Sequence, residues 1–485
     1  MMVKNGIIIE ENGEFFNTDI HLIFSGISVI LKGMKVKMIL PSLEEAKNPF
    51  WRPIKYSLFP PLGLATLAGY FSSDDEVELV DQHVEKLHTD DSPDLVCMQV
   101  YVTNAYRAYQ IADSYRSRGI HVVMGGLHVT SLPDEVLEHA DTVILGPGEE
   151  AFPRFISDFR SHKAEKIYVA KERSLENIPP VRRDLIKRSK YFVPNSLVIS
   201  RGCPHHCDFC YKDAFYGSGK SFYTCRVDST LKEIESLPGR HLYFLDDHLL
   251  GNKKFARELF DGMKGMKRVF QGAATVSSIL DGDLIEKAAE AGLRSIFVGF
   301  ETFSPKNLEQ SNKAQNLSRD YSAAVKRLHE LGIMINGSFV FGLDDDDKDV
   351  FSRTVDWAVE HAITTATFHI LTPYPGTRLF SKMESEGRIL TRNWSLYDTR
   401  HTVYKPALLT PTELESGYKR AYRDFYSWKN IFASCAHDAT LKNKLSHFAY
   451  TGGWKKMEPF WNLLIKCGLL NKMLPVLEFL LSHTK

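Results

Sequence analysis

Three cysteines lie close together in the segment SRGCPHHCDFCYK, which spans residues 200–212. Cys203, Cys207 and Cys210 have the spacing C-x3-C-x2-C. Thiolates this close in sequence can hold three irons of a cubane iron–sulfur cluster, and the fourth iron then has no protein ligand. A catalytic metal site requires such an open position, because a substrate can bind the metal there. The spacing therefore predicts a catalytic iron–sulfur cluster.

A structural zinc ion is the alternative for these thiols. It would need a fourth ligand, and His205 and His206 lie between the cysteines. No second Cys or His pair follows at a zinc-finger spacing, which disfavours zinc. The other four of the seven cysteines are scattered over the 485 residues and suggest no disulfide framework. This usage is typical of a reducing compartment, so we expect the protein in the cytoplasm.

Carboxylates follow two apolar runs beyond the cysteines. FLDDHLLGNK (244–253) contains Asp246 and Asp247, and VGFET (298–302) contains Glu301. An aspartate pair at the end of a strand can be a solvated turn. Glu301 directly follows a run that we expect to be buried, so its carboxylate needs a partner and is a candidate for a functional site.

The acidic run FGLDDDDKD at residues 341–349 could hold a divalent metal ion. It precedes the helical stretch DVFSRTVDWAVEHA at 349–362, and negative charge there complements the positive end of a helix. We therefore interpret the run as the start of a helix.

Two glycine turns occur in VVMGGLHVTSLPDEVLEHADTVILGPGEEAF (122–152). Gly125 and Gly126 follow one predicted strand, and Gly146 and Gly148 follow the next. Glycines at strand ends allow backbone amides to approach a bulky ligand or its phosphate. The first strand lacks G-x-G-x-x-G, and the chain lacks G-x-x-x-x-G-K-[ST], so dinucleotide and nucleoside triphosphate sites are disfavoured.

Strands and helices that could position these residues alternate along most of the chain. Residues 35–170 predict a doubly wound, Rossmann-like α/β domain with a mostly parallel sheet. Its expected strands are residues 36–40, 77–80, 94–100, 121–125 and 141–145. A linker rich in proline and charge follows at 171–195.

Residues 196–400 predict a partial (β/α)6 barrel of the TIM type. Its expected strands are residues 196–200, 241–246, 270–275, 295–300, 335–342 and 365–370. Function in such sheets lies at the carboxyl ends of the strands, and the cysteines and carboxylates fall there.

The two ends of the chain are less informative. Residues 401–485 indicate a helical, aromatic C-terminal region, either a cap on the barrel or a surface that covers substrate or touches a membrane. Residues 1–34 form an N-terminal extension without an assigned function, and its apolar run at 20–31 is shorter than the ~20 residues of a transmembrane helix. Sixty basic and sixty acidic residues leave no net charge, so no nucleic-acid partner is expected.

The C-x3-C-x2-C loop after the first barrel strand, with Phe209 before the last cysteine, resembles the signature of the radical S-adenosylmethionine superfamily. The resemblance implies a [4Fe-4S] cluster whose open iron chelates the amino and carboxylate groups of S-adenosylmethionine. It also implies that Asp246 or Asp247 contacts the methionine amino group and that Glu301 contacts the nucleoside. INGSFVFG (335–342) resembles the family's adenine-flanking strand, where Gly337 and Gly342 would permit close approach of the backbone.

The amino-terminal half adds a second resemblance. PPLGLATLAGYF (60–71), GGLH (125–128) and GPGEE (146–150) are similar to the cobalamin-binding domain of the radical S-adenosylmethionine relatives that include hopanoid methylases and the bacteriochlorophyll cyclase. We expect the corrinoid to be lined by Gly125, Gly126, His128, Gly146, Gly148 and Glu149.

The next pattern concerns a possible histidine ligand on the lower side of the cobalt. Many cobalamin domains supply a histidine from D-x-H-x-x-G, and Asp81-Gln82-His83 begins that way, but Lys86 replaces the glycine. The motif also belongs after the first strand, so we expect no such histidine ligand. Tyr101 or Thr103, after the third strand, could lie near the lower face or be ordinary loop residues.

Together, the two resemblances imply a methyltransferase that acts on an unactivated carbon. One S-adenosylmethionine would methylate the cobalamin, and a second would give a 5′-deoxyadenosyl radical that abstracts hydrogen. A cyclase or rearrangement enzyme on the same scaffold is the alternative, and a corrinoid carrier without chemistry is disfavoured by the open cluster. We expect an electron donor such as flavodoxin or ferredoxin. The substrate could be a lipid, a small metabolite or a protein residue.

Overall fold

The first sheet of the protein is six-stranded and wholly parallel, with the order β2-β1-β3-β4-β5-β6. The computed structural model describes residues 33–43, 58–171, 173–217, 221–437, 440–456 and 463. The strands are β1 (Lys35–Leu40), β2 (Glu76–Asp81), β3 (Leu95–Gln99), β4 (His121–Gly125), β5 (Thr142–Leu145) and β6 (Ile167–Val169). All five predicted strands are confirmed. The sequence did not predict β6, a three-residue edge strand whose IYV is too short to give a clear pattern.

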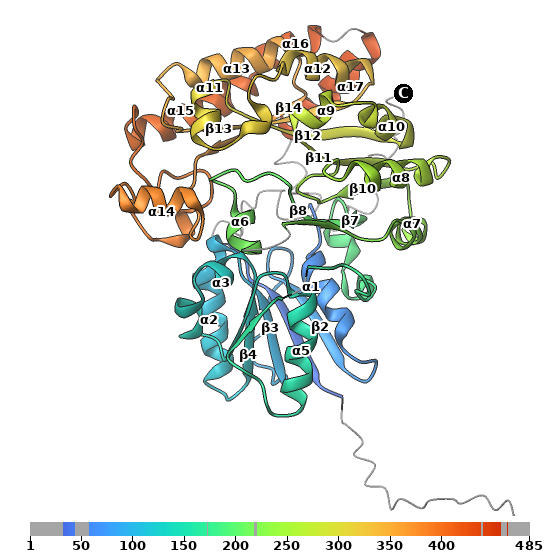
Figure 1. The fold of residues 1–485 in the computed structure, drawn as a ribbon, viewed down its shortest axis with the longest axis vertical. Helices are drawn as coiled ribbons and strands as arrows, with labels where there is room; N and C mark the ends of the chain where they lie inside the picture. Colours follow the sequence, from blue (N-terminus) through green and yellow to red (C-terminus); the bar gives the residue numbers. More distant parts are fainter. Residues whose placement is uncertain are drawn as a thin grey trace, which may run out of the picture. The chain divides into compact units, whose positions relative to one another are not determined.

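Helices cover both faces of this sheet, as predicted (Figure 1). They are α1 (Leu62–Leu67), α2 (Ala105–Arg116), α3 (Leu127–Ser131), α4 (Pro133–Leu137) and α5 (Gly148–Arg160). Successive residues of a strand point to opposite faces. Accordingly, Met38 packs in one apolar core with residues of α1 and α5, and Ile39 packs in the other with residues of α2.

The strand order creates a crevice. The chain leaves β1 toward β2 on one side and leaves β3 toward β4 on the other, so these two connections run in opposite directions at the boundary of β1 and β3. In sheets of this order ligands bind at that boundary, beyond the carboxyl ends of the strands.

The second sheet has six parallel strands in the order β14-β13-β12-β11-β10-β7, as expected for the partial barrel. The strands are β7 (Ser196–Leu197), β10 (His241–Phe244), β11 (Val269–Ala274), β12 (Leu293–Glu301), β13 (Met334–Phe341) and β14 (Thr365–Ile370). Between them lie α7 (Val227–Ser236), α8 (Lys253–Met263), α9 (Val276–Leu280), α10 (Leu284–Ala291), α11 (Pro305–Gln310), α12 (Tyr321–Glu330) and α13 (Val350–Glu360).

The first barrel strand is shorter than predicted. It ends at Leu197, because β8 (Ser200–Gly202) leaves the sheet and pairs antiparallel with β9 (Phe222–Thr224). Gly202 has φ +74°, and an added Cβ would lie 2.0 Å from the carbonyl oxygen of Ser221. Only glycine therefore fits at the position before the first cysteine.

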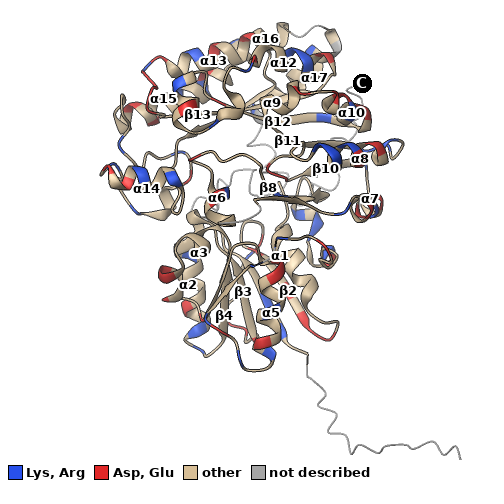
Figure 2. Ribbon diagram, in the orientation of Figure 1, with Lys and Arg blue, Asp and Glu red and all other residues tan. Residues whose placement is uncertain are grey.

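The barrel core lies between the sheet and its helices. Outward-facing strand residues such as Leu242, Ile296 and Phe339 are buried there. The intervening inward positions carry polar side chains such as Gln271, Asn336 and Thr367. Figure 2 shows acidic and basic residues mixed along the outer helices, for example on α8 and α13.

The C-terminal region continues with helices, as predicted: α14 (Arg378–Ser385), α15 (Pro411–Phe425), α16 (Trp428–Ala436), α17 (Leu441–Phe448) and a π-helical turn at Ala449–Lys456. The hydroxyls of Tyr422 on α15 and of Tyr426 directly after it hydrogen-bond the backbone NH and CO of Phe368 and Ala366, respectively. The open edge of β14 is thus capped.

The described residues include most of the linker but only part of the two chain ends. Within the described ranges, no helix is long and apolar enough to cross a membrane. Residues 1–32 of the extension and most of the sequence after 456 lie outside the described residues. The linker at 171–195 packs Ile186 and Tyr191 into the core of the first sheet.

Candidate active site

The three clustered cysteines lie on the loop between β8 and α6 (Tyr211–Tyr216). Cys207 is buried, and Cys203 and Cys210 are half-buried. Burial raises the pKa of the Cys203 thiol to about 11 and that of Cys210 to about 12. Thiolates here therefore need positive charge to offset the loss of water, and iron ions would supply it. The donor set thus fits an iron–sulfur cluster.

Single-ion sites were the alternative. Among the described residues, no three His, Cys, Asp or Glu side chains surround one point that a single metal ion could occupy. A cubane cluster has a different geometry, because each thiolate binds a different iron at a different corner. The two histidines between the cysteines contact other side chains: the Nδ1 of His206 lies 3.1 Å from Asp213, and the ring of His205 lies 5.7 Å from that of His248.

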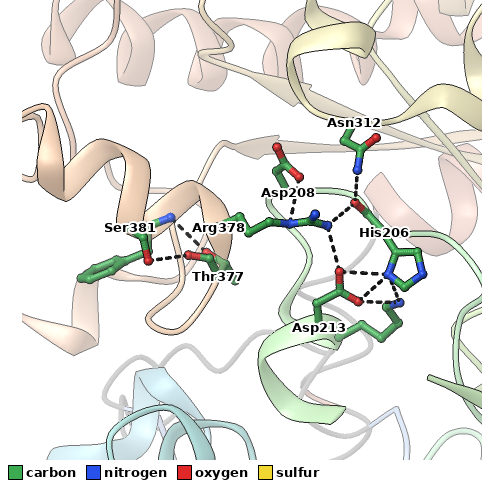
Figure 3. A network of polar contacts seen from close by, with 9 residues as sticks. His206, Asp208, Asp213, Asn312, Thr377, Arg378 and Ser381 are labelled. Atoms are coloured by element: carbon green, nitrogen blue, oxygen red, sulfur yellow. Dashed lines mark hydrogen bonds and ion pairs between the residues drawn. The ribbon is translucent and has the colours of Figure 1, made fainter. Parts of the chain in front are cut away.

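Arg378, the first residue of α14, fixes the cysteine loop (Figure 3). Its Nε lies 3.1 Å from Asp208, and its Nη2 lies 3.0 Å from Asp213 and donates to the carbonyl oxygen of His206 at 2.7 Å. The same carbonyl accepts from the Nδ2 of Asn312 at 2.8 Å. Segments more than 100 residues downstream therefore hold the loop. Sequence reasoning missed Arg378, although it directly follows the barrel-end sequence TPYPGT.

Glu301, at the end of β12, has the partner that its burial requires. Lys313 donates to its Oε1 at 2.5 Å, and the two side chains are only 7% and 13% exposed. The sheet register shifts between Gly299 and Glu301, and Glu301 has φ +66°. An added Cβ at Gly299 would lie 2.6 Å from the Glu301 carboxylate, so glycine there leaves room for the pair. Sequence reasoning did not identify Lys313.

The two aspartates after β10 differ in environment. Asp246 is buried and accepts hydrogen bonds from the backbone amides of Ile199 and Ser200 at 3.1 and 2.5 Å. Burial raises its pKa to about 7. Asp246 thus holds the chain that leads to the cysteines. Asp247 is exposed and accepts from the Tyr211 hydroxyl at 2.7 Å, so its carboxylate is the accessible one of the pair.

His248 is an additional candidate that sequence reasoning did not single out, although it follows the aspartate pair. It is buried, and burial lowers its pKa to about 3, so the ring is neutral. Its Nε2 lies 3.4 Å from the Thr275 hydroxyl. Its Nδ1 has no hydrogen-bond partner within the described part of the chain. A buried polar atom without a partner next to the cysteine loop fits a site that binds a further molecule.

A cavity of about 240 Å³ adjoins the cysteine loop. Phe209 lines it together with Leu343 and Leu371, which follow β13 and β14. Gly337 and Gly342 are not in its lining. An added Cβ at Gly337 would meet the Phe339 ring, and one at Gly342 would meet the Tyr404 hydroxyl. Protein side chains therefore lie beside both glycines, and contact of their backbone with S-adenosylmethionine stays a prediction.

A second cavity, of about 480 Å³, lies at the carboxyl ends of β1, β3, β4 and β5. Its lining includes both predicted glycine turns together with one predicted aromatic and one predicted acidic residue: Tyr101, Gly125, Gly126, Gly146, Gly148 and Glu149. The barrel half contributes Val198, Arg201, Phe215 and Leu245. Gly126 has φ +116°, and an added Cβ would lie 2.7 Å from the carbonyl oxygen of Val100. Mostly apolar walls with glycine turns form a cradle that suits a large, flat ligand.

Two residues predicted near the corrinoid, Thr103 and His128, do not line this cavity. Thr103 lies in a short 3-10 turn, Val102–Asn104. His128 is fully buried, with its Nε2 2.7 Å from the Tyr109 hydroxyl, so it supports packing behind the glycine turn. His83 has its Nδ1 2.8 Å from Asp81. That His83 is no cobalt ligand stays a prediction.

An ion pair connects the two candidate sites. Arg201, two residues before Cys203, lies with its Nη2 2.7 Å from the Oε1 of Glu149, the predicted corrinoid residue. No sequence pattern indicates this pairing, because the two residues lie in different predicted domains.

The acidic run at 341–349 is distributed among separate partners. Asp344 pairs with Arg388 at 2.7 Å, and Asp345 pairs with Lys306 at 2.8 Å. Asp346 is buried and accepts from the backbone amides of Gly342 and Leu343. These contacts give the run a structural role, but not the predicted one at a helix start, because α13 begins only at Val350 and its N-cap residue Asp349 makes no capping hydrogen bond with its side chain.

Three known families match successive parts of the chain. Residues 56–156 match the B12 binding domain, residues 197–358 match the radical SAM superfamily, and residues 377–475 match a domain of unknown function, DUF4070.

Individual proteins are similar over much of the chain. The bacteriochlorophyllide d C-12(1)-methyltransferase of Chlorobaculum tepidum is 29% identical over 76% of this chain and 83% of its own. The anaerobic magnesium-protoporphyrin IX monomethyl ester cyclase of Cereibacter sphaeroides is 26% identical over 64% of this chain and 56% of its own. The radical S-adenosylmethionine methyltransferase TsrM of Kitasatospora setae, solved with cobalamin and a [4Fe-4S] cluster, has a similar fold (TM-score 0.63, 14% identity), covering 90% of this chain and 99% of its own.

Proposed function

Because the chain belongs to the cobalamin-dependent radical S-adenosylmethionine enzymes, we propose that it transfers a methyl group to an unactivated carbon atom. One observation carries the proposal. The larger cavity is lined both by the glycine turns of the B12-binding domain and by Arg201, two residues before Cys203 of the barrel. A methyl donor and a hydrogen abstractor held at these two places would act on one substrate between them.

The bound cofactors supply the reactivity: cleaved S-adenosylmethionine provides a radical that removes a hydrogen atom, and cobalamin provides the methyl group. The residues of the chain bind and position. We propose that Cys203, Cys207 and Cys210 hold the cluster and that Asp247 binds the methionine amino group. Glu301 would bind the nucleoside, although its carboxylate also pairs with Lys313.

On the corrinoid side, the glycine turns at Gly125–Gly126 and Gly146–Gly148 would let the ring lie against the backbone. Tyr101, which accepts from Gln99 Nε2 at 3.0 Å, is the aromatic residue of the third-strand loop in this lining. The histidine motif begun by Asp81 and His83 would take no part, because His83 points to Asp81.

The substrate would lie at the barrel mouth, beyond the carboxyl ends of the strands. Inward positions nearer the amino ends of the strands are polar and already paired with each other: Gln271 lies 2.9 Å from His241, and Thr367 lies 3.3 Å from Asn336. A low-potential donor such as flavodoxin or ferredoxin would reduce the cluster. The described cysteines are free thiols, which is consistent with a cytoplasmic location.

A cyclase is the second candidate, because one similar protein is a cyclase. The two are separated by incubating the reconstituted enzyme with candidate substrates and S-adenosylmethionine that carries a deuterated methyl group. A methylase places the labelled methyl in the product, whereas a cyclase leaves the product unlabelled. The Cys203→Ala/Cys207→Ala/Cys210→Ala variant is the control and should give no product. Failure of the wild type with full cofactors to release deoxyadenosine would favour a carrier without chemistry.

A further inference from the structure

The segment that follows α11 runs along the cysteine loop. The backbone amide of Asp208 donates to the carbonyl oxygen of Ser311 at 3.0 Å, and Asn312 donates to the carbonyl oxygen of His206. Two hydrogen bonds between distant parts of the chain therefore fix residues 311–312 against the loop. The side chains of the next residues face the cysteines from a fixed backbone.

Gln315 makes the most direct contact. Its Nε2 donates a hydrogen bond to the Sγ of Cys207 at 3.3 Å. Cys207 is buried, and Gln315 is half-buried, so little water competes for this contact. An amide that donates to a cluster sulfur stabilises negative charge on that sulfur.

Lys313 places a positive charge at the same side. It is 6% exposed, and its Nζ lies 5.9 Å from the centroid of Phe209, the residue between Cys207 and Cys210 in the loop. Its ion-pair partner is Glu301 at 2.5 Å. In a buried setting, charges separated by several ångströms still interact strongly. Burial alone would lower the pKa of Lys313, but the nearby Glu301, Cys207 and Cys210 raise it and so favour the charged ammonium.

We infer that Gln315 and Lys313 are positioning residues that raise the reduction potential of the cluster bound by Cys203, Cys207 and Cys210. This inference rests on the proposed function only in assuming that cluster. Reduction adds one electron, taken from a protein donor or from dithionite, and no bond forms or breaks. The added negative charge is stabilised by the amide hydrogen bond and by the ammonium, so both favour the reduced state. Glu301 opposes this effect by partly offsetting the charge of Lys313.

The test is a potentiometric titration of the reconstituted full-length protein with dithionite, followed by the electron paramagnetic resonance signal of the reduced cluster. Iron and sulfide per chain report cluster content separately. Gln315→Leu and Lys313→Met should each shift the midpoint potential to more negative values. Glu301→Gln should shift it in the opposite direction, which general damage to the fold would not do. Lys306→Met removes an exposed lysine that pairs with Asp345 and should leave the potential unchanged.

Lys313→Met leaves Glu301 buried without its partner and could prevent folding. The Lys313→Met/Glu301→Gln variant removes both charges and should give a smaller negative shift. Wild-type potentials in Gln315→Leu and in this double variant, at full iron content, overturn the inference. Weaker binding of S-adenosylmethionine at an unchanged potential also overturns it and assigns Lys313 to that ligand instead. The titration needs no substrate, so a chain that holds the cluster but methylates nothing still tests the inference.

Discussion

Arg201 and Glu149 form an ion pair, with Nη2 2.7 Å from Oε1, across the junction of the B12-binding domain and the barrel. Their side chains are 16% and 11% exposed. Tyr70 donates to the backbone carbonyl oxygen of Glu149 at 2.8 Å. The wall of the 480 Å³ cavity, which we propose to hold the corrinoid, and the strand that leads to Cys203 are therefore fixed to each other.

Breaking this ion pair should destabilise the protein. Arg201→Met or Glu149→Gln alone should cost about 3 kcal/mol of unfolding free energy, because a partly buried charge loses its partner. The double variant should cost clearly less than the sum of the two. Chemical denaturation with a double-mutant cycle measures this coupling. The exposed pair Arg182–Asp184 is the control and should couple by less than about 1 kcal/mol. If the stability losses of Arg201→Met and Glu149→Gln simply add in the double variant, the two residues do not stabilise each other as proposed.

The glycine turn of the corrinoid cavity permits a matched comparison. Gly126→Ala should lower stability by more than about 1 kcal/mol, because its φ is +116° and the new Cβ would meet the carbonyl of Val100. Gly125→Ala should fold normally, since its Cβ would lie 3.6 Å from Ile144. Thermal melting and retention of added hydroxocobalamin measure both effects. Equal stability losses in the two variants would show that the backbone geometry of Gly126 does not matter.

Loss of the guanidinium that holds the cysteine loop should weaken cluster binding. In Arg378→Ala the contacts to Asp208, Asp213 and the carbonyl of His206 disappear together, and the loop loses its fixed form. We expect iron per chain after anaerobic reconstitution and desalting to fall by about half or more, in line with the effect of lost supporting contacts at metal sites. Arg353→Ala, which breaks an exposed pair with Asp347, should keep wild-type iron. A wild-type iron content in Arg378→Ala would show that Arg378 does not support cluster binding.

Stability should depend on pH through Asp346. Burial raises its pKa to about 7, whereas an unfolded aspartate titrates near 3.9. Between about pH 4 and pH 7 the native state therefore binds a proton that the unfolded state has lost. The free energy of unfolding consequently falls as pH rises through this window and levels off above about pH 7.

Asp346→Asn should remove this contribution. The difference in unfolding free energy between wild type and variant should fall across the window by at most about 4 kcal/mol, at about 1.4 kcal/mol per pH unit. Denaturation series at several pH values measure it. For Asp345→Asn the difference should change in the opposite sense, because Lys306 lowers the pKa of Asp345. A pH-independent difference for Asp346→Asn would contradict the assigned burial effect.

The sequence predicted features that depend on local patterns. Eleven strands could be recognised from short apolar runs, and the cysteine loop from its spacing. Partners chosen by tertiary contacts could not be recognised. Arg378 lies about 170 residues from Asp208, and Lys313 approaches the cysteines only because its segment is fixed to their loop.

Some residue types allow two interpretations. At Gly337 and Gly342 an added Cβ would meet Phe339, Tyr404 or Leu414, and the sequence does not distinguish this reason for glycine from contact with a ligand. His128 follows a glycine turn that does line the cavity, but the short helix α3 turns its ring inward to Tyr109.

The stoichiometry of S-adenosylmethionine consumption tests the central claim most directly. With its true substrate, the reconstituted enzyme should release deoxyadenosine and S-adenosylhomocysteine in about equal amounts, because each turnover uses one S-adenosylmethionine as radical source and one as methyl donor. Quantitative chromatography of both products against methylated substrate measures this ratio. Deoxyadenosine without S-adenosylhomocysteine above background, together with a substrate that gains no methyl group, would contradict the methyltransferase and leave the cyclase.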